Sequence, residues 1–171
     1  DITIFKSTTS GTNWITSITN IINEKHLYLN TNSTGGSGGF AINENSILLD
    51  NTFGDANTAG RIYYAFSWRS IPGYSKISYY KGNGGSDNKI YTGFKPGFLM
   101  IKLTETADQN WYIMDTALYG DSVEKYLMIN SGGAEDSLSG HLDITSDGFT
   151  LTKSSQAFNT SGYRYLYMAF V

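Results

Sequence analysis

The sequence contains no cysteine and only two histidines in 171 residues. Without cysteine there is no disulfide, no thiol nucleophile and no cysteine-ligated zinc site. The histidines, His26 and His141, stand far apart and match no metalloprotease or Ser-His-Asp spacing. We therefore expect no catalytic residues, no metal site and no cofactor, and we predict that the protein is not an enzyme.

Charge is also scarce. Charged residues make up 16% of the chain, the formal net charge is −3, and the lysines and arginines are spread singly. A nucleic-acid-binding protein carries a basic field, so no nucleic-acid partner is expected. No apolar run approaches the roughly 18 residues of a membrane span, so no membrane insertion is expected either. No signal peptide is visible, and the start at Asp1 without methionine suggests a fragment or a processed product.

Glycine and aromatic residues are abundant, with 19 glycines, 13 tyrosines and only two prolines. Aromatic residues favour half-buried pleated surfaces, and glycine favours tight turns between short strands. One turn and strand occurs twice, as Asn57 to Phe66 and as Asn159 to Phe170. Both copies are apolar at successive positions and close on Ala-Phe. Because such a strand is apolar on both faces, we predict that both copies lie centrally in a sheet.

Further matches between the two halves stay in sequence order. Phe5-Lys6 matches Ile101-Lys102, an offset of 102 − 6 = 96, and Ala65 matches Ala169, an offset of 169 − 65 = 104. Three more pairs fall between them: Asn13-Trp14 with Asn110-Trp111, Glu24–Asn30 with Glu124–Asn130, and Ile42–Asp50 with Ile144–Thr152. The pattern indicates a duplicated unit of about 100 residues, the size of a small β-sandwich domain.

We predict an all-β fold, an antiparallel β-sandwich or jelly roll, with residues 1–70 as a first repeat and 71–171 as a second, complete repeat. Residues 74–81 and 88–94 flank a Gly-Asn-Gly centre, which is typical of a β-hairpin. No counterpart of this hairpin belongs to the first repeat, which is therefore incomplete. Either the sequence begins within a unit, or the first repeat borrows a strand from elsewhere.

The turn residues of the second repeat divide it into short strands. We predict them at 74–81, 88–94, 97–104, 110–115, 125–130, 141–145, 148–153 and 162–170. Helical periodicity is weak, and single helical turns are candidates only at Thr16–Asn23 and Thr116–Lys125. Function is expected where the repeats differ, in the loops at 31–40 and 131–140 and at Trp68.

The tryptophans have two interpretations each. Trp14 and Trp111 occupy matching positions and are interpreted as core residues, with a sugar-stacking platform as the alternative. Trp68 finds no counterpart in the second repeat. We interpret it as a packing residue between the repeats, and ligand contact is the alternative.

Carboxylates are the remaining candidates, because glycoside hydrolysis needs only two in the right geometry. Glu135 and Asp136 are adjacent in a Gly/Ser-rich stretch, and we interpret this stretch as a solvated loop. The alternatives are a ligand-binding role for Glu135 and Asp136, or a Ca²⁺ site that also uses Asp115. No strand carries the alternating acidic pattern of jelly-roll glucanases.

Several motifs together resemble a tandem-repeat β-module of virion structural proteins from tailed phages, marine and cyanobacterial phages in particular. They are Gly73–Lys76, Tyr80–Gly84, Tyr91–Pro96, Met100–Lys102, Asn110–Tyr112, Ser146–Leu151 and Tyr165–Phe170. Such modules lie in tail fibres and other appendages, often near concanavalin-like lectin domains. The resemblance covers residues 71–171 almost completely and the first repeat from Asn13 to Phe66. It assigns no catalytic residue.

From this resemblance we expect a non-enzymatic virion structural protein, such as a tail fibre, surface fibre or decoration protein, on the virion surface. The expected partners are further copies in a symmetric oligomer, a trimer being usual in fibres, or other virion proteins. A host-surface glycan is a further expected ligand. The alternatives are a carbohydrate-active sandwich protein, either lectin or capsule depolymerase, and a purely architectural spacer.

Overall fold

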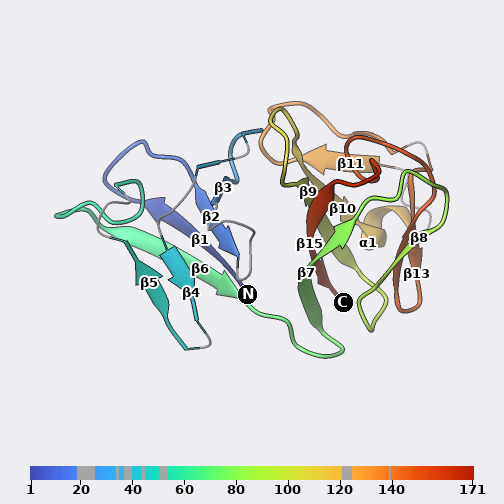
Figure 1. Ribbon diagram of the computed structural model, residues 1–171, viewed down its shortest axis with the longest axis horizontal. Coiled ribbons are helices and arrows are strands. Elements are labelled where there is room, and N and C mark those ends of the chain that lie inside the picture. The colour runs from blue at the N-terminus through green and yellow to red at the C-terminus, as the bar shows by residue number, and fades with distance from the viewer. Residues whose placement is uncertain are drawn as a thin grey trace. The chain divides into compact units, whose positions relative to one another are not determined.

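The computed structural model (Figure 1) describes residues 1–18, 26–33, 35–36, 40–43, 45–50, 54–120, 125–138 and 140–171. The chain divides into two compact units, unit 1 at Asp1–Arg69 and unit 2 at Ser70–Val171. The predicted boundary lay between residues 70 and 71. No helix among the described residues is long and apolar enough to cross a membrane.

The described residues of unit 1 form two antiparallel sheets. The larger has the strand order β3-β2-β1-β6, and the smaller pairs β4 with β5. The strands are β1 (Ile2–Ser7), β2 (Ile15–Ile18), β3 (Leu27–Tyr28), β4 (Phe40–Ile42), β5 (Ile47–Leu49) and β6 (Tyr63–Trp68). A small core of Phe5, Ile15 and Ala56 packs against Ile47 and Leu49 from the smaller sheet.

Unit 2 is built in the same way from more strands. Its larger sheet has the order β12-β11-β10-β9-β15-β7, and its smaller sheet the order β13-β14-β8. The elements are β7 (Ser75–Lys81), β8 (Asn88–Tyr91), β9 (Phe98–Leu103), β10 (Trp111–Asp115), α1 (Thr116–Tyr119), β11 (Lys125–Met128), β12 (Asp136–Ser137), β13 (Leu142–Thr145), β14 (Gly148–Leu151) and β15 (Arg164–Phe170).

The core of unit 2 lies between its two sheets. Alternate residues of β9 and β15, such as Ile101 and Tyr167, meet Phe149 and Leu151 from the smaller sheet in one buried cluster. Alternation places these residues on one face of each strand. Both units are therefore antiparallel β structures, and the prediction of an all-β, sandwich-like fold is confirmed.

Most strand positions predicted for unit 2 agree with the structure to within three residues. Two local predictions are wrong, one in each unit. Residues 131–140 were expected to be a loop, but Asp136–Ser137 form β12 beside β11. The helical candidate at Thr16–Asn23 begins as a strand, because Thr16–Ile18 belong to β2, and its residues 19–23 lie outside the described part. The candidate at Thr116–Lys125 contains the single turn α1, capped by Asp115.

The segment around Gly-Asn-Gly is not a hairpin. β7 pairs with β15 in the larger sheet, whereas β8 pairs with β14 in the smaller sheet. Gly82–Gly85 therefore forms a corner that carries the chain from one sheet to the other. The sequence signal for a reversal was correct, but it does not specify whether the two flanking strands pair with each other.

The repeated strand occupies different places in the two units. β15 lies between β9 and β7 and is buried on both faces, as predicted. β6 has one neighbour, β1, within the described part of the chain, and its residues Tyr64–Trp68 are exposed. The prediction of a central strand is thus wrong for β6, because no described strand covers its outer edge.

An equivalent hydrogen bond within each unit shows which residues of unit 1 correspond to which residues of unit 2. The Tyr63 hydroxyl accepts the Thr58 N–H at 3.1 Å, and the Tyr165 hydroxyl accepts the Thr160 N–H at 2.9 Å. Both pairs are offset by 165 − 63 = 102 residues. Ala65 therefore corresponds to Tyr167 and not to Ala169, so the alignment predicted for this strand is wrong by two residues. Under the corrected register Trp68, which lacked a counterpart in the sequence, corresponds to Phe170.

A second equivalent hydrogen bond lies beside β2 and β3 in unit 1 and beside β10 and β11 in unit 2. The backbone N–H of Trp14 donates to the Asn30 side-chain oxygen at 2.8 Å, and the backbone N–H of Trp111 donates to the Asn130 side-chain oxygen at 2.8 Å. The order β3-β2-β1-β6 likewise matches β11-β10-β9-β15. These shared features are the structural observations that favour duplication of one unit.

Candidate functional sites

An exposed row of aromatic side chains lies on β6 of unit 1. Tyr64, Phe66 and Trp68 alternate along the strand and so share one face. Their exposed fractions are 63%, 43% and 37%. The ring centroids are 6.2 Å apart between Tyr64 and Phe66 and 6.5 Å apart between Phe66 and Trp68.

Trp14 extends this row sideways from the loop before β2. Its ring centroid is 6.4 Å from that of Phe66, with 24° between the ring planes. The Lys6 ammonium lies 6.0 Å from the Trp14 ring centroid, a distance suited to a cation–π contact. We call Trp14, Tyr64, Phe66 and Trp68 the aromatic row.

The counterparts of the aromatic row in unit 2 are buried, apart from Phe170, the counterpart of Trp68, which is half-buried. Trp111 is fully buried, and Leu166 and Met168, the counterparts of Tyr64 and Phe66, are 1% and 4% exposed. Trp111 is thus buried, as a core residue would be. For Trp14, 37% exposed, the core interpretation is wrong. The aromatic row is a property of unit 1 alone.

Trp68 also borders an open groove of about 450 Å³ at one end of unit 1, lined by both polar and apolar side chains. Thr3 and Ser67 line the groove, and their hydroxyl groups are hydrogen-bonded to each other at 2.9 Å. The remaining lining residues are Asp1, Arg69 and five residues of β4, β5 and the turn between them, namely Ile42, Asn43, Asn45, Ser46 and Ile47. The packing of Trp68 between the repeats stays a prediction.

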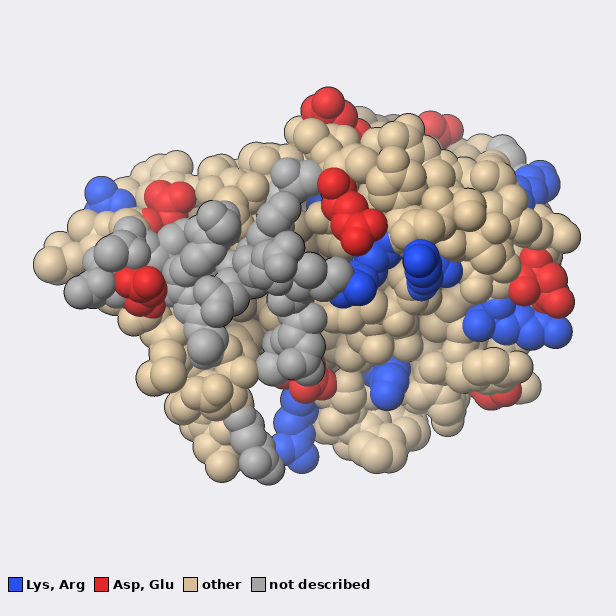
Figure 2. Space-filling model, in the orientation of Figure 1, with Lys and Arg blue, Asp and Glu red and all other residues tan. Residues whose placement is uncertain are grey.

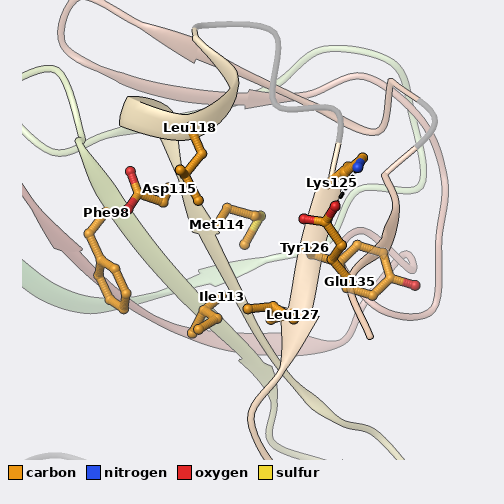
Figure 3. Close-up of a pocket in the computed structure, with 9 residues that line it drawn as sticks. All are labelled: Phe98, Ile113, Met114, Asp115, Leu118, Lys125, Tyr126, Leu127 and Glu135. Carbon is orange, nitrogen blue, oxygen red and sulfur yellow. Dashed lines mark hydrogen bonds and ion pairs between the residues drawn. The ribbon is translucent and has the colours of Figure 1, made fainter. Parts of the chain in front are cut away.

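A second site lies in unit 2 beside Glu135, where β10, β11 and α1 surround a small apolar pocket of about 150 Å³ (Figure 3). Its lining residues are Phe98, Ile113, Met114, Asp115, Leu118, Lys125, Tyr126, Leu127 and Glu135. Leu118 and Leu127 are 70% and 43% exposed, which leaves the mouth of the pocket apolar. A pocket of this size holds one aliphatic or aromatic group.

The acidic candidates of unit 2 all have structural partners. The Glu135 carboxylate forms an ion pair with the Lys125 ammonium at the rim of the pocket (Figure 3). Asp136 accepts the Ser137 N–H at 2.7 Å and the Tyr126 hydroxyl at 3.4 Å. Asp115 accepts the Ala117 N–H at 2.7 Å and so caps α1. Asp115 and Glu135 thus border one pocket, whereas Trp68 belongs to the other unit.

Within the described residues, no three His, Cys, Asp or Glu side chains are grouped so that they could hold a metal ion. The Ca²⁺ alternative using Asp115, Glu135 and Asp136 therefore gains no support from the described side chains. On the visible face acidic and basic side chains are interspersed, and most of the surface is uncharged (Figure 2).

One buried cation is found in unit 2. The Lys102 side chain is fully buried, its ammonium donates to the Gln109 carbonyl, and it lies 5.9 Å from the Trp111 ring centroid. Burial lowers the pKa of Lys102 to about 8. Burial likewise raises the pKa of Tyr80 well above its usual value, which keeps its hydroxyl protonated as a hydrogen-bond donor.

The whole chain, residues 1–171, matches the family described as domain of unknown function (DUF7483), and the protein belongs to this family. No curated protein and no solved structure matches the chain significantly.

The sequence alone predicted Trp68, Glu135 and Asp136 as ligand-binding candidates, and this stays a prediction; it did not point to Tyr64, Phe66 or the apolar pocket. Tyr64 and Phe66 resembled core residues because their counterparts in unit 2 are apolar. Their exposure becomes evident only in the structure, where no described strand lies beyond β6. One sequence signal could have indicated this exposure, namely that the segment predicted at 74–94 has no counterpart in the first repeat.

Proposed function

We propose that this protein is a non-enzymatic structural module of a virion appendage, such as a tail fibre, which assembles through unit 1 at the virion surface. The observation that carries the proposal is the aromatic row, which is exposed on unit 1 while the counterparts of Trp14, Tyr64 and Phe66 in unit 2 are buried. The sequence resemblance to phage appendage modules supplies the biological setting.

Exposed aromatic side chains of this kind are suited to association. Contiguous exposed apolar patches mark interaction sites, and aromatic residues are enriched at the centres of protein interfaces. The sparse charge of the chain leaves little electrostatic repulsion between copies. Further copies in a symmetric oligomer, a trimer in particular, or other virion proteins are the proposed partners.

The carboxylates support a non-enzymatic role. Asp115 and Glu135 border one pocket, as a glycosidase pair would, but both are already engaged. The Glu135 carboxylate is bound by the Lys125 ammonium, and the Asp115 carboxylate caps α1, so each already has a structural role. The pocket is also lined mainly by apolar side chains, which offer no hydrogen bonds to sugar hydroxyl groups.

Sedimentation of the purified chain tests the proposal. We expect the wild type to self-associate at micromolar concentration and Phe66→Asp to shift it to monomer. Tyr91→Asp is the matched control, because Tyr91 is a 66% exposed aromatic residue on β8 of unit 2 and should leave association unchanged. A wild type that stays monomeric at about 100 times that concentration would refute assembly through unit 1.

The second candidate function is glycan binding, which the exposed Trp14 of the aromatic row favours. An indole face gives a large contact area to a sugar ring, and the Lys6 ammonium beside it offers a hydrogen-bond donor. A glycan array with the wild type and Trp14→Ala tests it. Binding that Trp14→Ala abolishes would establish a lectin, and a blank array of bacterial surface sugars would exclude one. Loss of polysaccharide cleavage in Glu135→Gln would instead indicate a depolymerase.

A further inference from the structure

Among the described residues, no strand pairs with the outer edge of β6, whereas its counterpart β15 has β7 there. In unit 2, β7 pairs with β15 over seven residues, from Ser75 opposite Phe170 to Lys81 opposite Arg164 (Figure 1). In unit 1 the described chain offers β6 only the neighbour β1. An open strand edge presents unpaired N–H and C=O groups and is a template for another strand.

The hydrogen-bonding groups on this edge can be assigned. The Ile62 carbonyl accepts the Thr8 N–H, and the Trp68 carbonyl accepts from the terminal amine of Asp1. The even-numbered residues of β6 therefore direct their backbone N–H and C=O groups toward β1. Tyr63, Ala65 and Ser67 therefore direct their backbone groups to the open side. Their counterparts in β15 direct theirs toward β7, since the Tyr163 carbonyl accepts the Gly82 N–H at 2.8 Å.

A buried asparagine, Asn159, forms hydrogen bonds with the corner that follows β7. Asn159 is fully buried, its side-chain oxygen accepts the Asn83 N–H at 3.0 Å, and its amide donates to the Gly85 carbonyl at 2.9 Å. Its counterpart in unit 1, offset by 159 − 57 = 102 residues, is Asn57, which is exposed and donates to the Asp50 carbonyl at 3.2 Å. The described part of unit 1 thus has the asparagine that would bind such a corner, but not the corner itself.

Tyr80 of β7 makes the central side-chain contacts. Its ring stacks on Tyr165 with 5.0 Å between centroids and 7° between planes, and its hydroxyl donates to the Phe158 carbonyl at 2.7 Å. The counterparts of these two residues in unit 1 are Tyr63 and Ala56. A tyrosine on an added strand would stack on Tyr63 and reach the carbonyl of Ala56.

Two constraints define the added segment further. A side chain at Gly82 would place its Cβ 2.1 Å from the Thr160 carbonyl oxygen, so glycine is required after the strand. In addition, β8 continues from the corner to pair with β14, while the corresponding strand β5 has only β4 as a described neighbour. One segment that runs strand, corner, strand therefore completes both sheets at once.

Pairing of two β6 edges is a weaker alternative. An antiparallel pair centred on Ala65 would set Arg61 of each copy opposite Arg69 of the other, and like charges directly opposite destabilise a strand pair. It would also leave Asn57 and the edge of β5 without a partner strand.

We propose that unit 1 is an acceptor for strand complementation, completed by a strand–corner–strand segment with the chemistry of Ser75–Tyr91 that another repeat of this kind supplies. This inference specifies the partner in the assembly function proposed above. The acceptor consists of the outward edge of β6, the Tyr63 ring and the side chain of Asn57. The donor carries a tyrosine in place of Tyr80, followed by Gly-Asn-Gly.

A labelled synthetic peptide with the sequence Tyr74–Tyr91 tests the proposal by fluorescence polarisation against the full chain. We expect saturable binding that weakens at least tenfold for the peptide variants Tyr80→Ala and Gly82→Ala. In the protein, Ala65→Pro should abolish binding, because it removes an outward N–H, and proline is tolerated on edge strands. Asn57→Ala should weaken binding without perturbing an exposed turn.

No binding of the wild-type peptide would overturn the proposal. Binding that survives both Ala65→Pro and Asn57→Ala would also overturn it, since the peptide would then occupy another place, such as unit 2. The proposed function fails separately, in sedimentation: a chain that binds the peptide yet never self-associates keeps the acceptor and loses assembly between copies of this chain. A chain that self-associates but ignores the peptide does the reverse.

Discussion

Asn159 and Asn83 hold each other by two reciprocal hydrogen bonds. The Asn83 N–H donates to the Asn159 side-chain oxygen at 3.0 Å, and the Asn159 amide donates to the Asn83 side-chain oxygen at 3.1 Å. Through this pair the turn before β15 fixes the corner between β7 and β8, and with it the relation of the two sheets of unit 2.

Asn159→Ala should therefore destabilise unit 2 by about 3 kcal/mol, because several buried donors and acceptors lose their partner. Asn57→Ala is the matched control in unit 1 and should cost less than about 1 kcal/mol, since Asn57 is exposed. Chemical denaturation followed by circular dichroism measures both. Equal losses for the two variants would contradict the different roles of these asparagines.

Gly82→Ala should destabilise unit 2 by about 2 kcal/mol or more, because its Cβ would meet the Thr160 carbonyl oxygen at 2.1 Å. Gly132→Ala is the control, since a Cβ there meets nothing within 4 Å. Thermal unfolding of both variants decides the point. An unchanged melting temperature in Gly82→Ala would show that the corner can move away from β15.

The two tryptophans should differ in their contribution to stability. Trp111→Ala removes a fully buried indole and should cost about 3–5 kcal/mol, whereas Trp14→Ala removes one that is 37% exposed and should cost about 1–2 kcal/mol. Urea denaturation of the two variants measures the difference. Equal costs would mean that Trp14 is buried in solution, which would remove it from the aromatic row.

The buried Lys102 predicts a pH dependence of stability. Its pKa is about 8 in the folded protein and 10.5 in the unfolded chain, so the unfolded chain binds more protons between these values. The contribution of Lys102 to the free energy of unfolding should therefore rise from pH 8 toward pH 10. The rise is at most about 3 kcal/mol by the conversion of 1.36 kcal/mol per pKa unit.

Denaturation curves at pH 7.5, 8.5 and 9.5 test this prediction in the wild type and in Lys102→Met. The variant should lack the part of the slope that Lys102 causes, and its stability at pH 7.5 should be equal to or above that of the wild type. Identical slopes in both proteins would show that Lys102 stays charged in the folded state.

Much of the fold could be predicted from the sequence because alternation and turn residues are local signals. β9 at Phe98–Leu103 and β15 at Arg164–Phe170 lie within the strands predicted at 97–104 and 162–170. Long-range relations were less accessible. The Gly-Asn-Gly reversal could not reveal that β7 and β8 enter different sheets, and the Ala-Phe echo set β6 two residues out of register with β15.

The candidate site was harder to predict for a related reason. Phe66 and Met168 are equally apolar, yet they are 43% and 4% exposed. Their environments differ through neighbouring strands that lie far away in the sequence, and a local pattern carries no information about these. Asn57 and Asn159 are asparagines at equivalent positions of the repeated turn. Asn159 is buried and forms several hydrogen bonds because the corner at Gly82–Gly85 packs against it.

Amide hydrogen exchange along β6 tests the central claim, an acceptor edge on unit 1, most directly. In the isolated chain the outward amides of Tyr63, Ala65 and Ser67 should exchange rapidly, while those of Tyr165, Tyr167 and Ala169 exchange slowly beneath β7. Saturating Tyr74–Tyr91 peptide should slow the first set to near the rate of the second. Outward β6 amides that are already as protected as those of β15, or that the bound peptide leaves unprotected, would contradict it.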